Sequence, residues 1–166
     1  MKNLTRKKLI ILRGPMGIGK TTVGEALLKQ LPAAAYLDGD WCWNIHLFQV
    51  TEETKRMVMG NICHVLNSFL RCSAFENVVF CWVLHEQSIL DELLGQLDTD
   101  GWQVQAVSLV CGEAALRRRL EGDIAAGVRT PDVIGRSLAR LPLYRALSTV
   151  KIDTTAEILK AQMERP

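Results

Sequence analysis

The sequence predicts a single three-layer α/β domain over residues 1–166, with a five-stranded, mostly parallel sheet between layers of helices. Two observations predict this fold class. Five short apolar segments alternate along the chain with segments whose apolar residues recur at helical spacing, as in folds built from strand–helix–strand units. The most continuous apolar run, residues 77–84, has the composition of a central strand that is covered on both faces. No repeat or linker divides this domain-sized length.

The chain begins with a predicted strand, a glycine-rich loop and a helix. Residues 8–13 form a short apolar run. Residues 21–31 have apolar side chains at positions 23, 27, 28 and 31, which lie on one face of a helix that Pro32 ends. Between this strand and helix, residues 14–21 match the pattern G-x-x-x-x-G-K-[ST], whose backbone N–H groups cradle nucleotide phosphates.

Two further strands enclose a long helix. A second strand over residues 34–37 ends in the acidic turn 38–40. Thr51 is expected to cap a helix over residues 51–74, because its hydroxyl can accept an N–H group of the first turn. The run 77–84 is the third strand. The apolar stripe of the long helix is expected at Val58, Ile62, Val65, Leu66 and Phe69.

The second half of the chain continues the alternation of helices and strands. Turn-forming residues separate two elements at residues 98–101, and the glycine and proline of residues 127–131 interrupt a helical pattern. Pro142 is expected to kink the helix that contains it. The expected elements are helices over 85–98, 113–126, 132–147 and 155–163, and strands over 103–111 and 150–153.

Composition and charge exclude several classes of protein. The formal net charge is +2, so we expect no broad basic surface for nucleic acid. The apolar stretch that follows the basic N-terminus is too short for a secretory signal, and the later run 78–84 is too short to cross a bilayer. The five cysteines form no C-x-x-C pair, which favours free thiols and no zinc site. We therefore expect a cytoplasmic protein without a membrane or nucleic-acid partner.

The glycine-rich loop predicts a nucleotide site. Lys20 is expected to reach the terminal phosphates, and the hydroxyl of Thr21 to bind Mg²⁺. A turn that binds nothing is the alternative, but a strand and a helix flank the loop as the motif requires. We therefore expect ATP and Mg²⁺ as cofactors. The expected nucleotide-binding residues of the loop are Gly14, Pro15, Met16, Gly17, Ile18, Gly19, Lys20, Thr21 and Thr22.

Asp38 and Asp40 form a second candidate constellation on either side of a glycine. Because the strand is expected to end here, both carboxylates can reach the carboxyl edge of the sheet, where ligands bind in such folds. We assign Asp38 to the metal shell and Asp40 to the proton of an acceptor hydroxyl, although the two roles can be exchanged, and a polar turn is the alternative. The strand 77–84 lacks the following aspartate of a Walker B motif, so Glu86 is a further candidate for the metal shell.

Arginines gather in residues 117–136, which contain two possible glycine hinges and are expected to form a lid. Closure would exclude water and bring arginine to the transferring phosphoryl group. Arg119 and Arg129 are the expected catalytic arginines, and surface charge balanced by nearby carboxylates is the alternative. Arg136 and Arg140 are expected to share one face of the following helix.

The acceptor is expected to bind within residues 38–74. Trp41 and Trp43 lie in a connection, where two exposed indole rings are unfavourable. They either pack under the long helix or line an acceptor pocket together with Asn44 and His46. A binding or structural role fits His46 better than a catalytic one.

The glycine-rich loop, the turn 38–40, the arginine-rich segment and residues 152–154 together resemble the P-loop kinases of the nucleoside monophosphate kinase fold. Within that group the chain is similar to gluconate, shikimate and adenylylsulfate kinases and to chloramphenicol phosphotransferase. The resemblance implies a P-loop NTPase fold with a helical lid and an acidic pair near Mg²⁺ and the acceptor hydroxyl. It also implies a lid arginine at Arg119 and a loop beside the adenine at Asp153 and Thr154.

Two departures from that group narrow the expected function. No arginine lies between Arg13 and Arg56 to hold an acceptor phosphate, and the Gly-Gly pair of shikimate kinases is absent. We predict a monomeric or homodimeric phosphotransferase that moves the γ-phosphoryl group of a nucleoside triphosphate to a hydroxyl of a small-molecule acceptor. The alternatives are a nucleoside or nucleotide kinase and a P-loop ATP-binding regulator with slow hydrolysis. No Asn-Lys-x-Asp motif indicates a GTPase.

Overall fold

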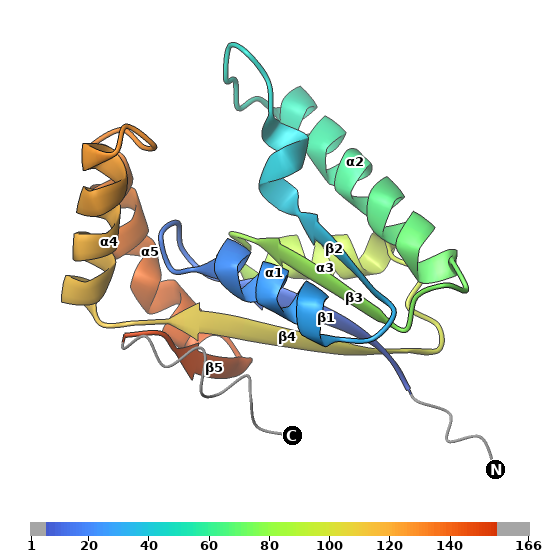
Figure 1. Cartoon of the computed structure of the whole chain (residues 1–166). Coiled ribbons are helices and arrows are strands. Elements are labelled where there is room, and N and C mark those ends of the chain that lie inside the picture. Colours follow the sequence, from blue (N-terminus) through green and yellow to red (C-terminus); the bar gives the residue numbers. More distant parts are fainter. Residues whose placement is uncertain (1–5, 156–166) are drawn as a thin grey trace.

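The sheet of the computed structural model, which describes residues 6–155, confirms the predicted fold class (Figure 1). It pairs the strands in the order β2-β3-β1-β4-β5, and every pair is parallel. The central β1 therefore delivers the glycine-rich loop to the carboxyl edge of the sheet, between two neighbouring strands. The strands are β1 (Lys7–Arg13), β2 (Ala34–Asp38), β3 (Asn77–Trp82), β4 (Trp102–Val110) and β5 (Val150–Asp153).

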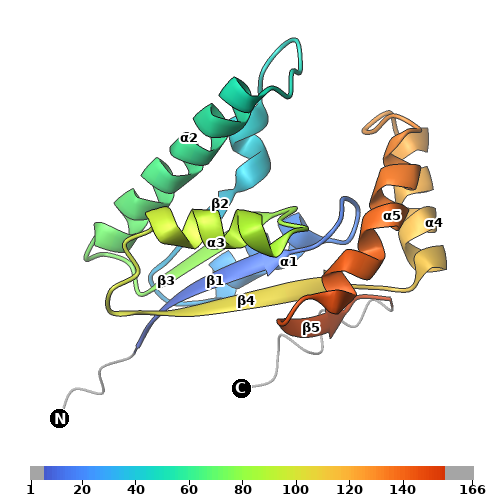
Figure 2. The same ribbon diagram turned by 180° about the vertical axis from the view of Figure 1, so that it is seen from behind.

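Helices connect the strands and cover both faces of the sheet. In Figure 1, α1 lies in front of the sheet, whereas in the reverse view of Figure 2 α3 lies in front of it. Helices α4 and α5 pack against each other beyond the end of β4 (Figures 1 and 2). The helices are α1 (Lys20–Gln30), the short 3₁₀ helix η1 (Gly39–Trp43), α2 (Glu52–Arg71), α3 (Gln87–Gln96), α4 (Glu113–Ala125) and α5 (Val133–Ala146).

Strand β3 separates two apolar cores. Its side chains alternate in direction, so Val78 and Phe80 pack with buried residues of α2 and α3. Val79 and Cys81 pack instead with buried residues of α1, α4 and α5. Burial on both faces explains why this strand has a continuous apolar run in place of an alternating one.

The connection after β3 corrects two predicted boundaries. The strand expected over residues 77–84 ends at Trp82, and the helix expected from His85 begins at Gln87. Leu84 adopts a left-handed backbone conformation with φ of 39°, which neither a strand nor a right-handed helix can continue. Residues 83–86 therefore leave the sheet, and Val83, Leu84 and His85 line a cavity.

The N-terminus of α2 confirms the capping role of Thr51. Its hydroxyl accepts the N–H group of Thr54 at 3.1 Å, and the Thr54 hydroxyl accepts the N–H group of Thr51 at 2.8 Å. The helix ends at Arg71, earlier than expected, because the chain turns there towards β3. Pro142 lies inside α5. The helix predicted over residues 155–163 lies outside the described residues.

All five cysteines are free thiols. Cys63, Cys81 and Cys111 are buried, so they pack as small apolar side chains of the two cores. Within residues 6–155, no helix combines the length and the apolar character needed to cross a bilayer.

Candidate active site

The glycine-rich loop connects β1 to α1 at the carboxyl edge of the sheet. Gly17 and Gly19 have left-handed φ angles of 81° and 104°, which residues with a Cβ seldom adopt. A Cβ on Gly17 would also lie 2.6 Å from Cδ2 of Leu120 in α4. The left-handed glycines and the packing of α4 therefore hold this loop in one backbone conformation.

Lys20 begins α1, and its side chain turns back into the loop. Its Nζ donates to the carbonyl oxygens of Gly14 at 2.8 Å and Pro15 at 2.9 Å. Burial lowers the pKa of Lys20 to about 8, although the nearby carboxylates of Asp40 and Asp38 act in the opposite direction. A bound anion would stabilise the protonated form of this amine, which burial disfavours. The buried lysine therefore favours the binding of an anion.

Thr21 and Asp38 meet between α1 and β2. The Thr21 hydroxyl donates to Oδ2 of Asp38 at 3.0 Å, and the other carboxylate oxygen accepts the N–H group of Asp40 at 3.0 Å. The hydroxyl of Tyr36 lies 3.4 Å from the same Oδ2. Hydroxyl and carboxylate oxygens suit Mg²⁺, which is completed in such sites by phosphate and water oxygens. The chemistry of this pair, an exposed hydroxyl and a buried carboxylate, therefore fits a magnesium ion.

Asp40 lies in η1 and lines a cavity beside the loop. Asp40 is exposed to solvent, yet desolvation of its carboxylate beside the loop raises its pKa, and the negative charge of Asp38 adds to this effect. The positive charges of Lys20 and Arg129 oppose it. The structure thus brings the loop lysine and both aspartates of the turn to one edge of the sheet.

Arg119 ties α4 to the far side of the loop. Its guanidinium donates to the hydroxyl of Thr154 at 3.1 Å, to the Thr154 carbonyl, and to the carbonyl of Ile18 at 3.5 Å. Thr154 is fully buried against the same Ile18 carbonyl. Asp153 is exposed, and hydrogen bonds from Thr155 lower its pKa. Arg119 and Thr154 therefore lie against the loop, whereas Asp153 lies at its outer margin.

Arg117, Arg129 and Arg136 of the arginine-rich segment form ion pairs. Arg129 donates to Asp123 at 2.9 Å, and Arg117 lies 3.9 Å from Glu113. The charge of Arg129 still acts on the site, because it contributes to the lowered pKa of Lys20. Arg117 thus fits the alternative of surface charge that a nearby carboxylate balances. Arg129 is also paired, but it lies close enough to Lys20 to lower its pKa.

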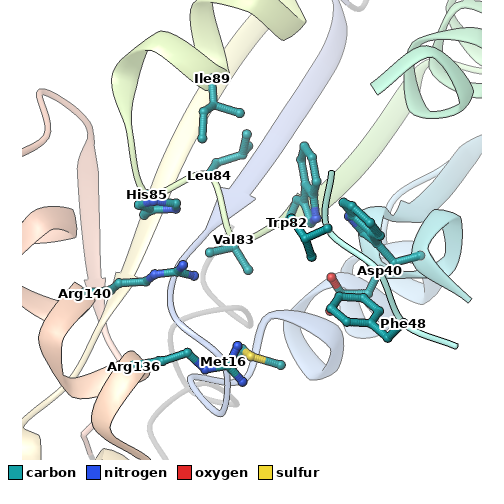
Figure 3. Close-up of a pocket in the computed structure, with 12 residues that line it drawn as sticks. Met16, Asp40, Phe48, Trp82, Val83, Leu84, His85, Ile89, Arg136 and Arg140 are labelled. Carbon is teal, nitrogen blue, oxygen red and sulfur yellow. The ribbon is translucent and has the colours of Figure 1, made fainter. Parts of the chain in front are cut away.

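A cavity of about 430 Å³ opens beside Asp40 (Figure 3). Its volume suits a small molecule. Arg136 and Arg140 extend from α5 on one side, and Asp40 and Phe48 lie on the other side (Figure 3). The described residues that line it are Met16, Asp40, Trp43, Phe48, Val50, Trp82, Val83, Leu84, His85, Ile89, Arg136 and Arg140.

The two tryptophans after Asp40 have different surroundings. Trp43 packs against the core of α2 and α3 and also lines the cavity, where its ring centroid lies 5.4 Å from that of Phe48. Trp41 is 57% exposed and meets Tyr36 edge-on, so neither expectation holds for it. Residues two apart in a 3₁₀ helix point in different directions, which separates the two rings. Two further candidates do not line the cavity and are exposed to solvent: Asn44 and His46.

Two buried side chains hold residues 83–86 at the cavity wall. Arg13 is fully buried at the end of β1 and donates from Nε to the Leu84 carbonyl at 2.9 Å and from Nη2 to the Glu86 carbonyl at 3.4 Å. The Tyr144 hydroxyl donates to the Val83 carbonyl at 2.7 Å. Sequence reasoning missed both roles, because the partners lie 71 and 61 residues away along the chain. The sequence did offer one indication of the role of Arg13, because an arginine at the end of an apolar strand needs a hydrogen-bond partner when it is buried.

Sequence reasoning also missed most of the cavity wall. Phe48 and Trp82 come from a connection and from a strand end, which no local pattern brings together. Arg136 and Arg140 do share a helix face, as expected, but their place at the cavity depends on how α5 packs. Their spacing of one helical turn was the signal that two cations act on the same surface.

Solved structures of kinases and of a tunicamycin resistance protein share this fold. A gluconokinase from Sinorhizobium meliloti 1021 has a TM-score of 0.66 at 22% identity, over 93% of this chain and 89% of that chain. The tunicamycin resistance protein of Deinococcus radiodurans has a TM-score of 0.68 at 18% identity, over 97% and 98%. Shikimate kinase from Acinetobacter baumannii, in complex with shikimate, has a TM-score of 0.60 at 21% identity, over 98% and 94%. At these identities the likeness shows a common fold.

Sequence comparison identifies the family. No curated protein matches the chain significantly. A family model described as "AAA domain" matches residues 10–131, which contain β1, the glycine-rich loop, the acidic turn and α4. The strand order and the kinase structures that share it agree with the resemblance to P-loop small-molecule kinases. The chain therefore belongs to the AAA domain family, with the fold of the P-loop kinases.

Proposed function

We propose that this protein is an ATP- and Mg²⁺-dependent phosphotransferase that moves the γ-phosphoryl group of ATP to a hydroxyl of a small molecule. The supporting observation is that Asp40 belongs to both halves of the site. Its N–H group binds the Asp38 carboxylate beside Thr21, and its side chain lines the cavity. A donor at the loop and an acceptor in the cavity would meet at this residue. Phosphoryl transfer depends chiefly on such positioning and on charge stabilisation.

The loop would bind the phosphates of ATP. Lys20 would exchange the carbonyls of Gly14 and Pro15 for phosphate oxygens, whose negative charge raises its pKa and keeps it protonated. Thr21 and Asp38 would hold Mg²⁺, which neutralises phosphate charge when bound. The donor half of the site thus needs only side chains that already lie together.

Asp40 would accept the proton of the acceptor hydroxyl. The acceptor oxygen forms a bond to the γ-phosphorus while the bond from that phosphorus to the bridging oxygen breaks, and ADP leaves. Because desolvation raises the pKa of Asp40, its carboxylate is a stronger base than an aspartate with the ordinary pKa. Arg129 would exchange Asp123 for the transferring phosphoryl group, and Arg119 would hold Thr154 beside the loop.

The same proposal assigns larger parts of the chain. Residues 38–74 would form the acceptor region, since η1 and the following connection contribute to the cavity. Residues 117–136 would act as the lid, and Gly127, with φ of 72°, follows the end of α4 within it. Free thiols support a reducing, cytoplasmic compartment.

A comparison of two aspartate variants tests this function. ADP release is measured with purified protein, Mg²⁺ATP and a panel of small alcohols that includes sugar acids, hydroxy acids and nucleosides. We expect Asp40→Asn to lower acceptor-dependent turnover about 10²–10⁴-fold, as for loss of a general base, and to leave ATP affinity nearly unchanged. The matched control is Asp98→Asn, an exposed residue after α3, which should retain turnover.

Other results would contradict the proposal in distinct ways. Wild-type turnover in Asp40→Asn would remove the role of that carboxylate. ATP binding without acceptor-dependent ADP release across the panel would favour the regulator, and turnover restricted to nucleosides would favour a nucleoside kinase.

A further inference from the structure

The cavity beside Asp40 offers few groups that could bind a polyhydroxylated molecule. Eight of its twelve lining side chains are apolar, and they include the aromatic rings of Trp43, Phe48 and Trp82. None of the described lining residues has a hydroxyl or an amide in its side chain. Among the described residues, the polar lining consists of the side chains of Asp40, His85, Arg136 and Arg140 and the indole N–H groups of Trp43 and Trp82, so Asp40 and His85 are its only side-chain oxygen or nitrogen acceptors.

Two backbone carbonyls of the cavity wall are also engaged. The Val83 carbonyl accepts the hydroxyl of Tyr144 at 2.7 Å, and the Leu84 carbonyl accepts Arg13 at 2.9 Å. These two backbone acceptors are therefore already paired within the protein. Each ligand hydroxyl buried here without a partner weakens binding about tenfold or more, because it gives up its hydrogen bonds to water. Several such hydroxyls, as in a sugar acid, are strongly disfavoured.

Within the part of the chain that the structure describes, one positive charge of the cavity lacks a counter-ion. Arg140 extends from α5 towards the middle of the cavity, across from Asp40 (Figure 3). It makes no hydrogen bond or ion pair with any residue of the range 6–155, whereas Arg136 lies 3.0 Å from Asp132. Burial and the charge of Arg140 lower the pKa of His85, so this ring is neutral at physiological pH. An anionic group of the ligand would pair with Arg140.

We propose that the acceptor is an anionic alcohol with an apolar body. Its anion binds Arg140, its apolar body lies against the wall of Trp43, Phe48 and Trp82, and its hydroxyl lies at Asp40. This inference rests on the proposed phosphotransferase function, because it identifies the acceptor of that reaction. A carboxylate and a phosphate monoester share the required charge, so the experiment includes both.

Equilibrium binding of defined probes tests the inference separately from turnover. The probes are 3-phenyllactate, mandelate, 2-hydroxy-4-methylpentanoate, the neutral amide of 3-phenyllactate, the 1-phosphate of 3-phenylpropane-1,2-diol, and gluconate. Ligand-observed NMR titration gives each dissociation constant, and ADP release with Mg²⁺ATP is measured in parallel. We expect at least one apolar anionic probe to bind about tenfold or more tightly than both the neutral amide and gluconate. The tighter of the carboxylate and phosphate forms identifies the anion.

Two variants locate the binding. Arg140→Met should weaken the anionic probes about tenfold or more and leave the neutral amide unchanged. Phe48→Ser, at a position that is 65% exposed and so does not threaten folding, should weaken the apolar probes but not gluconate. The matched control is Arg71→Met, which removes an arginine at the end of α2 and should change neither set.

The outcomes separate this inference from the proposed function. If gluconate binds as tightly as the apolar anions, if none of those anions binds, or if Arg140→Met weakens the amide equally, the inference is wrong. ADP release that responds to gluconate or to a neutral alcohol alone would support the phosphotransferase and overturn the inference. The expected binding pattern without ADP release would support the assignment of the cavity's ligand class and contradict the phosphotransferase.

Discussion

Gly39 is a position where a single methyl group should disturb both stability and catalysis. It lies between Asp38 and Asp40, and the indole of Trp82 packs directly on it. A Cβ at Gly39 would lie 2.5 Å from Cγ and 2.6 Å from Cδ1 of Trp82. These atoms are near the root of the indole side chain, so they cannot move away without shifting the whole ring or the turn.

The size of the effect follows from this overlap. Overpacking of a filled core costs typically about 1–3 kcal/mol. For a chain of this length, about 1 kcal/mol lowers Tm by roughly 2–4 °C, so Gly39→Ala should lower Tm by roughly 2–12 °C. Displacement of the turn by about 1 Å should also reduce acceptor-dependent turnover about 10²-fold, because Asp40 would leave its position beside the donor.

Thermal unfolding and ADP release measure the two effects. The matched control is Gly95→Ala in α3, where no atom lies within 4 Å of the added Cβ. Alanine is favoured over glycine within a helix by up to about 1 kcal/mol, so this control should unfold at an equal or higher temperature. If Gly39→Ala has the same Tm and the same turnover rate as the wild type, the contact between the turn and Trp82 does not determine the position of Asp40.

Three further predictions concern the loop and its supports. The pKa of Lys20 is about 8 before an anion binds, and it should rise when negatively charged phosphates lie beside the amine. Nucleotide binding at pH 9 should therefore take up a proton, and nucleotide affinity should fall as pH increases above 8. Calorimetry in two buffers of different ionisation enthalpy measures this uptake, and equal heats in both would contradict it. Arg13→Met leaves the Leu84 carbonyl without its donor and should cost about 1–3 kcal/mol in urea unfolding; an unchanged midpoint would show that the cavity wall does not need this arginine. Thr51→Ala removes the N-cap of α2 and should cost about 1 kcal/mol in the same assay, whereas Thr51→Ser should retain most of the stability.

Local sequence patterns predicted the features that depend on neighbouring residues. The glycine-rich loop was recognisable because one short segment contains the whole phosphate cradle, including Lys20. The cap at Thr51 depends on a partner three residues away, and its role was confirmed. The end of β3 at Trp82 was not predictable, because the apolar run continues to Leu84 while the backbone there takes a left-handed conformation.

Features that depend on distant residues were decided by the tertiary structure. The sequence determined a five-stranded α/β domain and located the acidic turn, since strand and helix periods are local properties of the chain. It did not show that Asp40 would face an apolar cavity, or that Arg140 would lie across from it. Those placements depend on how η1 and α5 pack against the edge of the sheet, and packing is set by contacts between residues far apart in the chain. Side chains such as Arg13 and Tyr144 acquire their roles only when folding brings such partners together.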